Sequence, residues 1–328
     1  MSVAKVLLNF FRAAANSYGL SVTAGLILSL VIGESWVVVA FYNTFAPPLW
    51  LPSLLAFPLA LLTRSWLTAM LTLPPLLAFA FSFGARFLPA SAVPQEATLS
   101  VLSYNLLANG RDVRASLAIL REANADIVSL QELSVMASES FERELADLYP
   151  YRALYPQARG TQGQGVLSKY PILRHRYWQY DDLAAYLGHQ RAEVEVQGKP
   201  LVIYNVHPSH PGMAGSFFDP SVRSEDIRRI LAMTAGERLP VLLMGDFNMP
   251  ELSDDYKRIT LSFGDSYARV GRGMGWTFPH VEAMGWLPPF LRLDYVFFSP
   301  SFVPISAQVV GTSGGSDHYP LLVRFFWQ

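Results

Sequence analysis

The chain divides near residue 97 into a continuously apolar segment and a segment in which apolar and polar positions alternate. In the first segment, residues 20–42 are apolar apart from glycine, serine and Glu34, and a membrane helix needs about 20 such residues. Two further apolar runs, 47–63 and 65–83, contain several prolines. The pattern predicts an N-terminal transmembrane region of three helices. The alternative is that the last two runs form a re-entrant or interfacial hairpin.

The few charges in this first segment set its expected orientation. Lys5 and Arg12 precede the first run, and Arg64 separates the second from the third. With three spans these cations share the cytoplasmic side, and the chain beyond residue 97 emerges on the outer side; only Arg86 opposes this bias. Glu34 is an ionisable group within a predicted span, so it is either functional or a partner of a neighbouring helix.

Beyond residue 97, short apolar β-type runs alternate with a few helical patterns. The expected strands are 99–105, 126–132, 165–168, 192–196, 201–206, 241–244, 293–298 and 321–326, and the expected helices are 113–123 and 223–234. Many strands with few helices indicate an α+β or layered sandwich fold. We therefore expect a membrane anchor over 1–97, ending in a linker at 88–97, and a second domain over 98–328.

Composition excludes several classes of protein. The chain is 51% apolar and only 16% charged, which excludes a disordered protein. It has no cysteine, which excludes disulfides, zinc–thiolate sites, iron–sulfur clusters and a cysteine nucleophile. Its net charge is −1, and the acidic side chains beyond residue 97 outnumber the basic ones. No overall basic field is therefore available to hold nucleic acid.

Six of the apolar runs carry polar residues at or next to their ends, all of them Asn, Asp, Glu or His. They are Asn105, Glu132, Asn205 with His207, Asp246 with Asn248, Asp294, and Asp317 with His318. Side chains at strand ends can converge on one rim of a sandwich, where rigid strands position them. Lys, Ser and Thr, which a solvated rim would contain, are missing from this set, so the pattern indicates a site.

These residue types suit hydrolysis of a phosphate ester. A hard cation such as Mg²⁺ takes oxygen ligands, and Glu132 is the natural primary ligand, with the amide oxygen of Asn105 beside it. His318 is a candidate general base, because imidazole titrates close to neutral pH. Asp246 could orient the attacking water or be the base itself. Taken singly, each motif is more typical of a surface charge or a turn than of a site.

The order of the motifs carries a resemblance. The segments Ser103-Tyr-Asn105, Gln131-Glu132, Asn205-Val-His207, Gly245-Asp-Phe-Asn248, Arg292-Leu-Asp-Tyr295 and Ser316-Asp-His318 occur in the order of the endonuclease/exonuclease/phosphatase superfamily. Residues 98–328 therefore resemble that superfamily. The resemblance implies a four-layer α/β/β/α sandwich and a divalent-metal-dependent phosphoric ester hydrolase that uses Mg²⁺, or Mn²⁺ or Ca²⁺.

The resemblance also implies roles for the remaining residues. Asp294 would be the carboxylate partner of His318, and Asp317 would face the metal beside Glu132 and Asn105. It further implies that His207 contacts a phosphoryl oxygen or the leaving group. Asn248, two positions after Asp246 and expected on the same side of an extended segment, would donate a hydrogen bond to a phosphoryl oxygen.

A narrower resemblance concerns substrate and location. His207-Pro-Ser-His-Pro211, Gly275-Trp-Thr-Phe-Pro279 and the apolar N-terminus resemble a bacterial membrane-anchored branch that includes teicoplanin-resistance membrane proteins. This implies a lipid-linked phosphate substrate at the outer face of the cytoplasmic membrane, with the bilayer as a partner. The alternatives are an extracellular nuclease, a sphingomyelinase- or inositol-phosphatase-like enzyme, and a non-catalytic binding domain. The acidic balance argues against tight binding of duplex nucleic acid.

Three further features border these motifs. His210 either touches the substrate or packs away from it. Arg223 could meet an anionic substrate, but we expect it on the outward face of its helix. Apolar side chains precede Asp294, and they either pack the loop or contact the bilayer or a lipid chain. They are Trp276, Phe278, Trp286, Leu287, Phe290 and Leu291.

Overall fold

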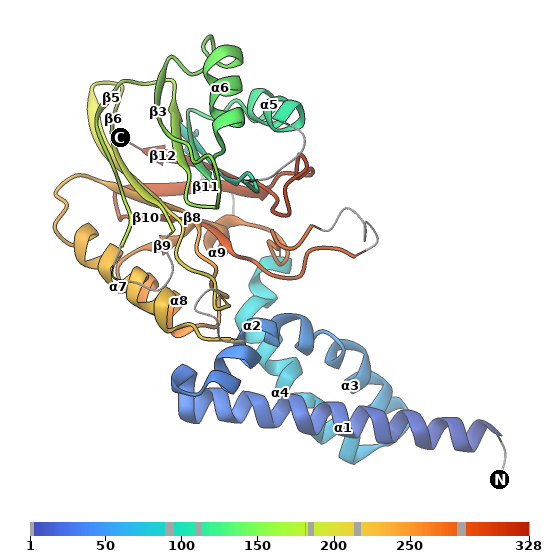
Figure 1. The fold of residues 1–328 in the computed structure, drawn as a ribbon. Helices are drawn as coiled ribbons and strands as arrows, with labels where there is room; N and C mark the ends of the chain where they lie inside the picture. The colour runs from blue at the N-terminus through green and yellow to red at the C-terminus, as the bar shows by residue number, and fades with distance from the viewer. Residues whose placement is uncertain are drawn as a thin grey trace. The chain divides into compact units, whose positions relative to one another are not determined.

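A computed structural model describes residues 3–88, 95–108, 113–180, 182, 187–212, 218–280 and 287–327. The chain forms two compact units. Figure 1 shows them coloured from blue at the N-terminus to red at the C-terminus. One unit is Met1–Pro89 together with Glu251–Asp254, and the other is Ala90–Pro250 together with Asp255–Gln328. Most of the linker expected at 88–97 lies outside the described residues.

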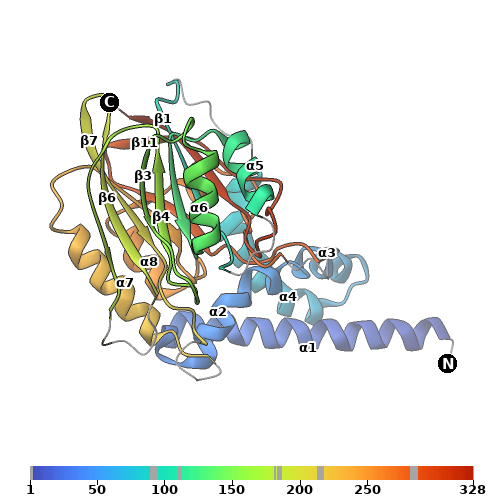
Figure 2. The same cartoon turned by 45° about the horizontal axis from the view of Figure 1, so that its top comes forward.

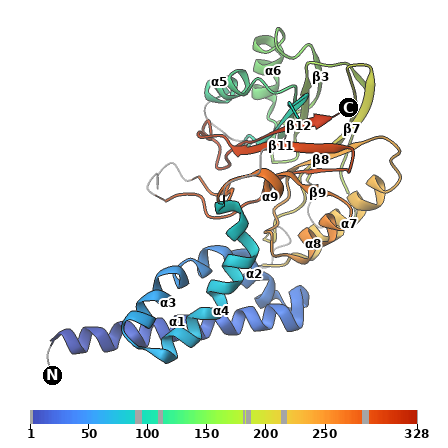
Figure 3. The ribbon, with the colours of Figure 1, turned by 180° about the vertical axis from the view of Figure 1, so that it is seen from behind.

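The first unit is helical. Its elements are α1 (Val3–Ile32), the short 3₁₀ turn Gly33–Ser35, α2 (Val37–Trp50), α3 (Ser53–Leu62), α4 (Trp66–Phe83) and a final 3₁₀ turn, Gly84–Phe87. α1 packs against α2 and α4, and α3 packs against α4 (Figure 3). Large apolar side chains point outward, among them Leu62 at 80% exposed and Phe81 at 86%. An apolar outer surface of this kind is typical of helices that face lipid.

Two helices are long and apolar enough to cross a membrane, Lys5–Ser35 and Trp66–Phe87. α2 and α3, bent by 55° at their junction, would make a third if they are counted as one span. The expected first span at 20–42 is wrong, because α1 starts at residue 3 and the helix breaks at Gly33, whose φ is +66°. Lys5 and Arg12 therefore lie within α1 and do not precede it.

Glu34 lies in this break and has structural partners. Its Oε2 accepts a hydrogen bond from the backbone N–H of Asp254 at 3.0 Å, and Asp254 Oδ2 accepts from the backbone N–H of Glu34 at 3.1 Å. Glu34 Oε1 also accepts from Asn43 Nδ2 at 3.2 Å. Of its two expected roles, the structure thus places Glu34 as a packing partner.

The second unit contains two mixed six-stranded sheets. In the first, the strand order is β11-β12-β1-β2-β4-β3, with β1 and β2 parallel. Its strands are β1 (Leu99–Asn105), β2 (Ile127–Gln131), β3 (Tyr151–Tyr155), β4 (Gln164–Ser168), β11 (Phe302–Val309) and β12 (Leu321–Trp327). In the second, the order is β5-β6-β7-β8-β10-β9, with β7 and β8 parallel. Its strands are β5 (Ile172–Trp178), β6 (His189–Val196), β7 (Lys199–Val206), β8 (Val241–Asp246), β9 (Gly264–Asp265) and β10 (Asp294–Phe298).

Helices cover the outer face of each sheet. α5 (Val113–Ala123) and α6 (Val135–Glu144) pack on the first sheet through one apolar cluster (Figure 2). α7 (Ser221–Thr234) and α8 (Asp254–Thr260) pack on the second through another, and α9 (Ser266–Val270) is a short turn beside β10. A third apolar cluster fills the space between the sheets. The α+β, four-layer α/β/β/α architecture is therefore confirmed.

The inner faces of the sheets change from apolar to polar along the strands. On β1, Leu99 and Val101 belong to the core between the sheets, and Asn105 ends the same face. On β8, Leu242 and Met244 lead in the same way to Asp246. Because side chains two positions apart share a face, the pleat carries these polar groups to one end of the sandwich.

Candidate active site

Two neighbouring strands place two carboxylates opposite each other. Asp246 ends β8 and Asp294 begins β10, and the two are direct partners in the antiparallel ladder. Gly245, just before Asp246, has φ +148°, and a Cβ there would lie 1.9 Å from the carbonyl oxygen of Val206 on β7. Only glycine allows β7 and β8 to approach this closely at the site.

Asp246 lies at the centre of the site, in contact with three other polar side chains. Its Oδ2 accepts a hydrogen bond from Asn105 Nδ2 at 3.1 Å. The same oxygen lies 3.5 Å from His207 Nε2 and 3.5 Å from His318 Nε2. All four residues are buried, at 4% exposure or less. Residues from both sheets thus meet around one carboxylate oxygen.

Glu132 joins this group immediately after β2. Asn105 Nδ2 donates to Glu132 Oε1 at 3.1 Å, and His207 Nε2 lies 3.9 Å from the same oxygen. The backbone N–H of Ala108 donates to Oε2 at 3.0 Å. Glu132 has φ +57°, a left-handed conformation that is costly for a glutamate and is found mostly where function requires it.

His318 is oriented by Asp294. Its Nδ1 lies 2.8 Å from Asp294 Oδ2, so Nε2 is the ring nitrogen that faces Asp246. Ser316 Oγ accepts from the backbone N–H of His318 at 3.1 Å and donates to the carbonyl of Asn105 at 2.7 Å. The Ser-Asp-His segment is thereby fixed to the end of β1.

Burial and charge shift the pKa values of these groups. Burial disfavours the imidazolium of His318, but the carboxylates of Asp294 and Asp246 outweigh it and raise the pKa of His318 to about 10. Burial, with the nearby charge of Asp246, also raises the pKa of Asp294. Burial opposes ionisation of Asp246, yet the two histidines lower its pKa to about 2. The cluster therefore keeps a proton on the Asp294–His318 pair at neutral pH, with Asp246 ionised.

Asn248 does not share an extended face with Asp246. It has φ +49°, and its backbone N–H donates to Asp246 Oδ1 at 2.9 Å, which forms a tight turn. Its Nδ2 donates one hydrogen bond to the carbonyl of Pro208 at 3.0 Å. An amide nitrogen carries two hydrogens, so the second remains available to a ligand.

Arg223 is not on the outward face of its helix, so that expectation is wrong. It is 1% exposed, its Nε donates to Asp255 Oδ2 at 3.0 Å, and its Nη1 donates to the carbonyl of Asn248 at 2.9 Å. A carboxylate on α8 compensates the charge of Arg223, which allows the side chain to turn inward and hold the turn that carries Asn248.

The loop after His207 is held by residues that sequence reasoning missed. His189 Nδ1 accepts from the backbone N–H of His207 at 3.3 Å, and His189 Nε2 lies 3.7 Å from Asp226 Oδ1. Asp226 Oδ2 accepts from both the backbone N–H and the hydroxyl of Ser209. His210, next in the chain, is exposed and accepts from the backbone N–H of Gly212 at 3.1 Å.

Thr277 and Phe278 contact the site next to Asp294 and His318. Thr277 Oγ1 accepts from the backbone N–H of Leu293 at 3.2 Å and lies 3.4 Å from that of Asp294. The ring of Phe278 lies 4.7 Å from that of His318, measured between centroids. The apolar stretch before Asp294 therefore packs, in part, on the site itself, although Trp286 lies outside the described residues. The Gly275-Trp-Thr-Phe-Pro279 motif in the sequence already marked Thr277 and Phe278 as neighbours of the site.

The comparisons with known proteins agree with this geometry. The model of the Endonuclease/Exonuclease/phosphatase family matches residues 102–318. The chain belongs to this family. The family's members are metal-dependent phosphoester hydrolases, and this chain is such an enzyme. The family match does not separate branches, so the narrower resemblance to teicoplanin-resistance membrane proteins stays a prediction.

Solved structures share the fold. A family member from Bacteroides vulgatus superposes with a TM-score of 0.57 at 21% identity, covering 70% of this chain and 99% of that one. A humanized D. rerio TDP2 gives 0.58 at 18% identity, with 70% and 98% covered. A mannosyl-6-phosphatase of Bacteroides thetaiotaomicron gives 0.55 at 19%, with 70% and 100% covered. A search of curated proteins found no match.

The donor set fits the divalent metal that the family uses. Asp246, Asp294 and His318 bring one ligand atom each to within 4.8 Å of the others. His318 Nδ1 is already bonded to Asp294, however, and a protonated imidazole cannot ligate. Glu132 offers hard oxygen ligands beside this group. Asn105 turns Nδ2 toward Glu132 and Asp246, and its Oδ1 accepts from the backbone N–H of Leu107, so its amide must turn over to present an oxygen to a cation. Burial raises the pKa of Asp317, and the charges of Glu132 and Asp246 act in the same direction.

Proposed function

We propose that this enzyme is a Mg²⁺-dependent phosphoesterase, held in the bacterial cytoplasmic membrane by its helical unit, that hydrolyses a lipid-linked phosphate ester or pyrophosphate at the outer face. The observation that carries the proposal is one chain that joins the family's catalytic fold to helices long and apolar enough to cross a membrane. A lipid substrate is confined to the bilayer that holds such a helix, so the enzyme meets it without a search through bulk water.

In this proposal Glu132, Asn105 and Asp317 hold the cation. When bound, Mg²⁺ neutralises charge on the phosphoryl oxygens. His207 and the free amide hydrogen of Asn248 donate hydrogen bonds to the same oxygens, which stabilises the charge that grows in the transition state.

The attacking water is proposed to sit between Asp246 and His318. Their nearest atoms, Oδ2 and Nε2, are 3.5 Å apart, so a water can hydrogen-bond to both. At neutral pH Asp246 is ionised and can accept the water's proton, while the protonated His318 can only donate a hydrogen bond to the water oxygen. Asp294 determines which imidazole nitrogen faces that position, the same orienting role that the third member of a hydrolase triad has.

The test is a substrate panel with the detergent-purified full-length protein. We would compare undecaprenyl pyrophosphate, sphingomyelin, phosphoinositides and DNA with Mg²⁺, Mn²⁺ or Ca²⁺, using His318→Gln as the inactive control. We expect kcat/KM for a lipid-linked phosphate to exceed that for DNA by at least about tenfold. Preference for DNA over every lipid would contradict the substrate and favour a nuclease. Equal inactivity of wild type and His318→Gln would favour a binding domain.

Orientation needs its own experiment. A reporter fused after Gln328 is expected to be active outside the cytoplasm. Reporter activity confined to the cytoplasm would contradict the outer-face assignment and leave the catalytic assignment intact.

A further inference from the structure

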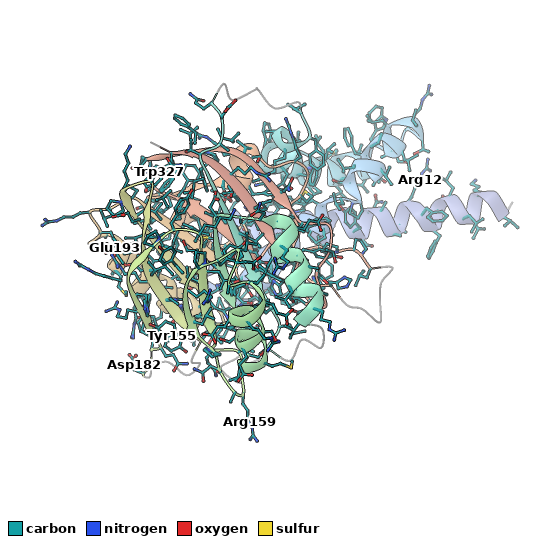
Figure 4. The ribbon with its side chains drawn as sticks, turned by 90° about the horizontal axis from the view of Figure 1, so that it is seen from above. Arg12, Tyr155, Arg159, Asp182, Glu193 and Trp327 are labelled. Carbon is teal, nitrogen blue, oxygen red and sulfur yellow. The ribbon has the colours of Figure 1, made fainter. Side chains whose placement is uncertain are left out.

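The guanidinium of Arg12 has no anionic partner among the described residues. Arg12 on α1, labelled in Figure 4, donates through Nη2 to the backbone carbonyl of Thr63 at 2.9 Å. That is the one hydrogen bond its guanidinium makes in the described structure, and its Nε is buried without a partner. Placing an unpaired charge among apolar helices is costly, so such a residue usually binds something.

Arg12 also lines the edge of an apolar pocket of about 490 Å³ in the same unit. The pocket lies between α1, α3 and the turn into α4, and its apolar wall includes Phe11, Ala15, Leu55 and Leu59. Its polar lining is confined to Arg12, Thr63, Ser65 and Thr68. The volume is within the range of roughly 300–1,000 Å³ that is typical of ligand sites.

A charged group at the edge of an apolar pocket selects an amphiphile of opposite charge. We propose that this pocket binds one anionic phospholipid, with a phosphodiester oxygen accepting hydrogen bonds from the free Nη hydrogens of Arg12, and with an acyl chain along Leu55 and Leu59. The phosphate supplies the missing countercharge, and the chain fills apolar volume. This site is separate from the catalytic residues and does not depend on the proposed function.

The experiment is native mass spectrometry of the full-length protein in detergent, with phosphatidylglycerol or phosphatidylcholine added at equal concentration. We expect wild type to retain one phosphatidylglycerol in preference to phosphatidylcholine, and Arg12→Gln to lower the retained fraction about tenfold. Arg64→Gln is the matched control, because Arg64 is exposed on the adjacent turn and is not part of the pocket lining.

Further variants keep the proposal testable if Arg12→Gln does not fold. Ala56→Trp fills the pocket and is expected to abolish retention, while Arg12→Lys keeps the charge and retains part of it. Equal retention of the two lipids by wild type would overturn the proposal, as would an equal loss in Arg64→Gln. Competition by inorganic phosphate at millimolar concentration would also overturn it, because the site would then bind a free anion.

Discussion

Asn105, the last residue of β1 in one sheet, donates a 3.1 Å hydrogen bond to Asp246, the last residue of β8 in the other sheet. The same amide nitrogen donates to Glu132 at 3.1 Å. One side chain therefore bridges two carboxylates that would otherwise repel each other, and it does so at the place where the sheets meet.

We predict that Asn105→Ala lowers kcat by on the order of 10²–10³-fold, the range seen when one positioned donor is removed from an active site. Asn105→Asp should be worse, because it adds a third negative charge between Glu132 and Asp246. Steady-state kinetics at saturating Mg²⁺ measure the effect, and circular dichroism checks the fold. Gln308→Ala on β11, an exposed amide, is the control. An unchanged kcat in Asn105→Ala would contradict the bridging role.

We expect Asp294→Asn and Asp317→Asn to reduce the activity of the enzyme in two different ways. Asp294→Asn removes the carboxylate that orients His318 Nδ1, so we expect kcat to fall by about 10²–10⁴-fold at any Mg²⁺ concentration. Asp317→Asn removes a proposed metal ligand, so the Mg²⁺ concentration for half-maximal activity should rise while kcat at saturation changes less. A metal titration of both variants separates the two effects. If Asp294→Asn were rescued by added Mg²⁺, its orienting role would be wrong.

The interior of both sheets was predictable from the sequence, and the edges were not. The edge strands are β3, β5, β9 and β11, and none of them was among the expected elements. β5 carries exposed Arg174 and Arg176, and β11 contains Pro304 next to a shift in register. Edge strands use charges and proline to avoid pairing with other chains, which removes the apolar alternation that makes a strand recognisable.

The site residues that could be predicted were also those with a local sequence pattern, and the ones that were missed depend on long-range contacts. Asn105 and Asp246 end apolar strands, so their pattern in the sequence was sufficient to mark them as candidates. His189 supports the site only through contacts with segments far along the chain, and no local spacing encodes such contacts. Arg223 was placed wrongly for a related reason, because its inward orientation depends on Asp255 in another helix.

A buried ion pair away from the site should make the fold sensitive to acid. Arg292 Nη1 donates to Asp265 Oδ1 at 3.2 Å, and the same carboxylate caps α9. Burial disfavours the charge of Asp265, but Arg292 and the capping N–H groups outweigh it and lower the pKa of Asp265. Its stabilising contribution is therefore present above the unfolded pKa of about 3.9 and is lost as pH falls through the lower folded value.

Thermal unfolding between pH 7 and pH 3 measures this contribution. We expect Asp265→Asn to lower the free energy of unfolding by about 3–5 kcal/mol at pH 7, because it removes a buried carboxylate that pairs with the buried Arg292 charge. The difference from wild type should shrink toward the acid end. Asp147→Asn, which breaks an exposed pair with Arg121, is the control and should have little effect at either pH. A constant difference across the pH range would contradict the assignment.

The helical unit holds the segment Glu251–Asp254 through a second buried pair, and this pair can be tested by replacing one or both partners. Arg86 Nη1 donates to Glu251 Oε2 at 3.1 Å, and both side chains are less than 8% exposed. Arg86→Met should destabilise the full-length protein in detergent by about 3–5 kcal/mol, since it removes a buried cation that pairs with the buried carboxylate of Glu251. Arg86→Met combined with Glu251→Met should recover much of that loss, because it removes both buried charges. If the double variant unfolds at the same temperature as Arg86→Met alone, the ion pair does not account for how this segment is held.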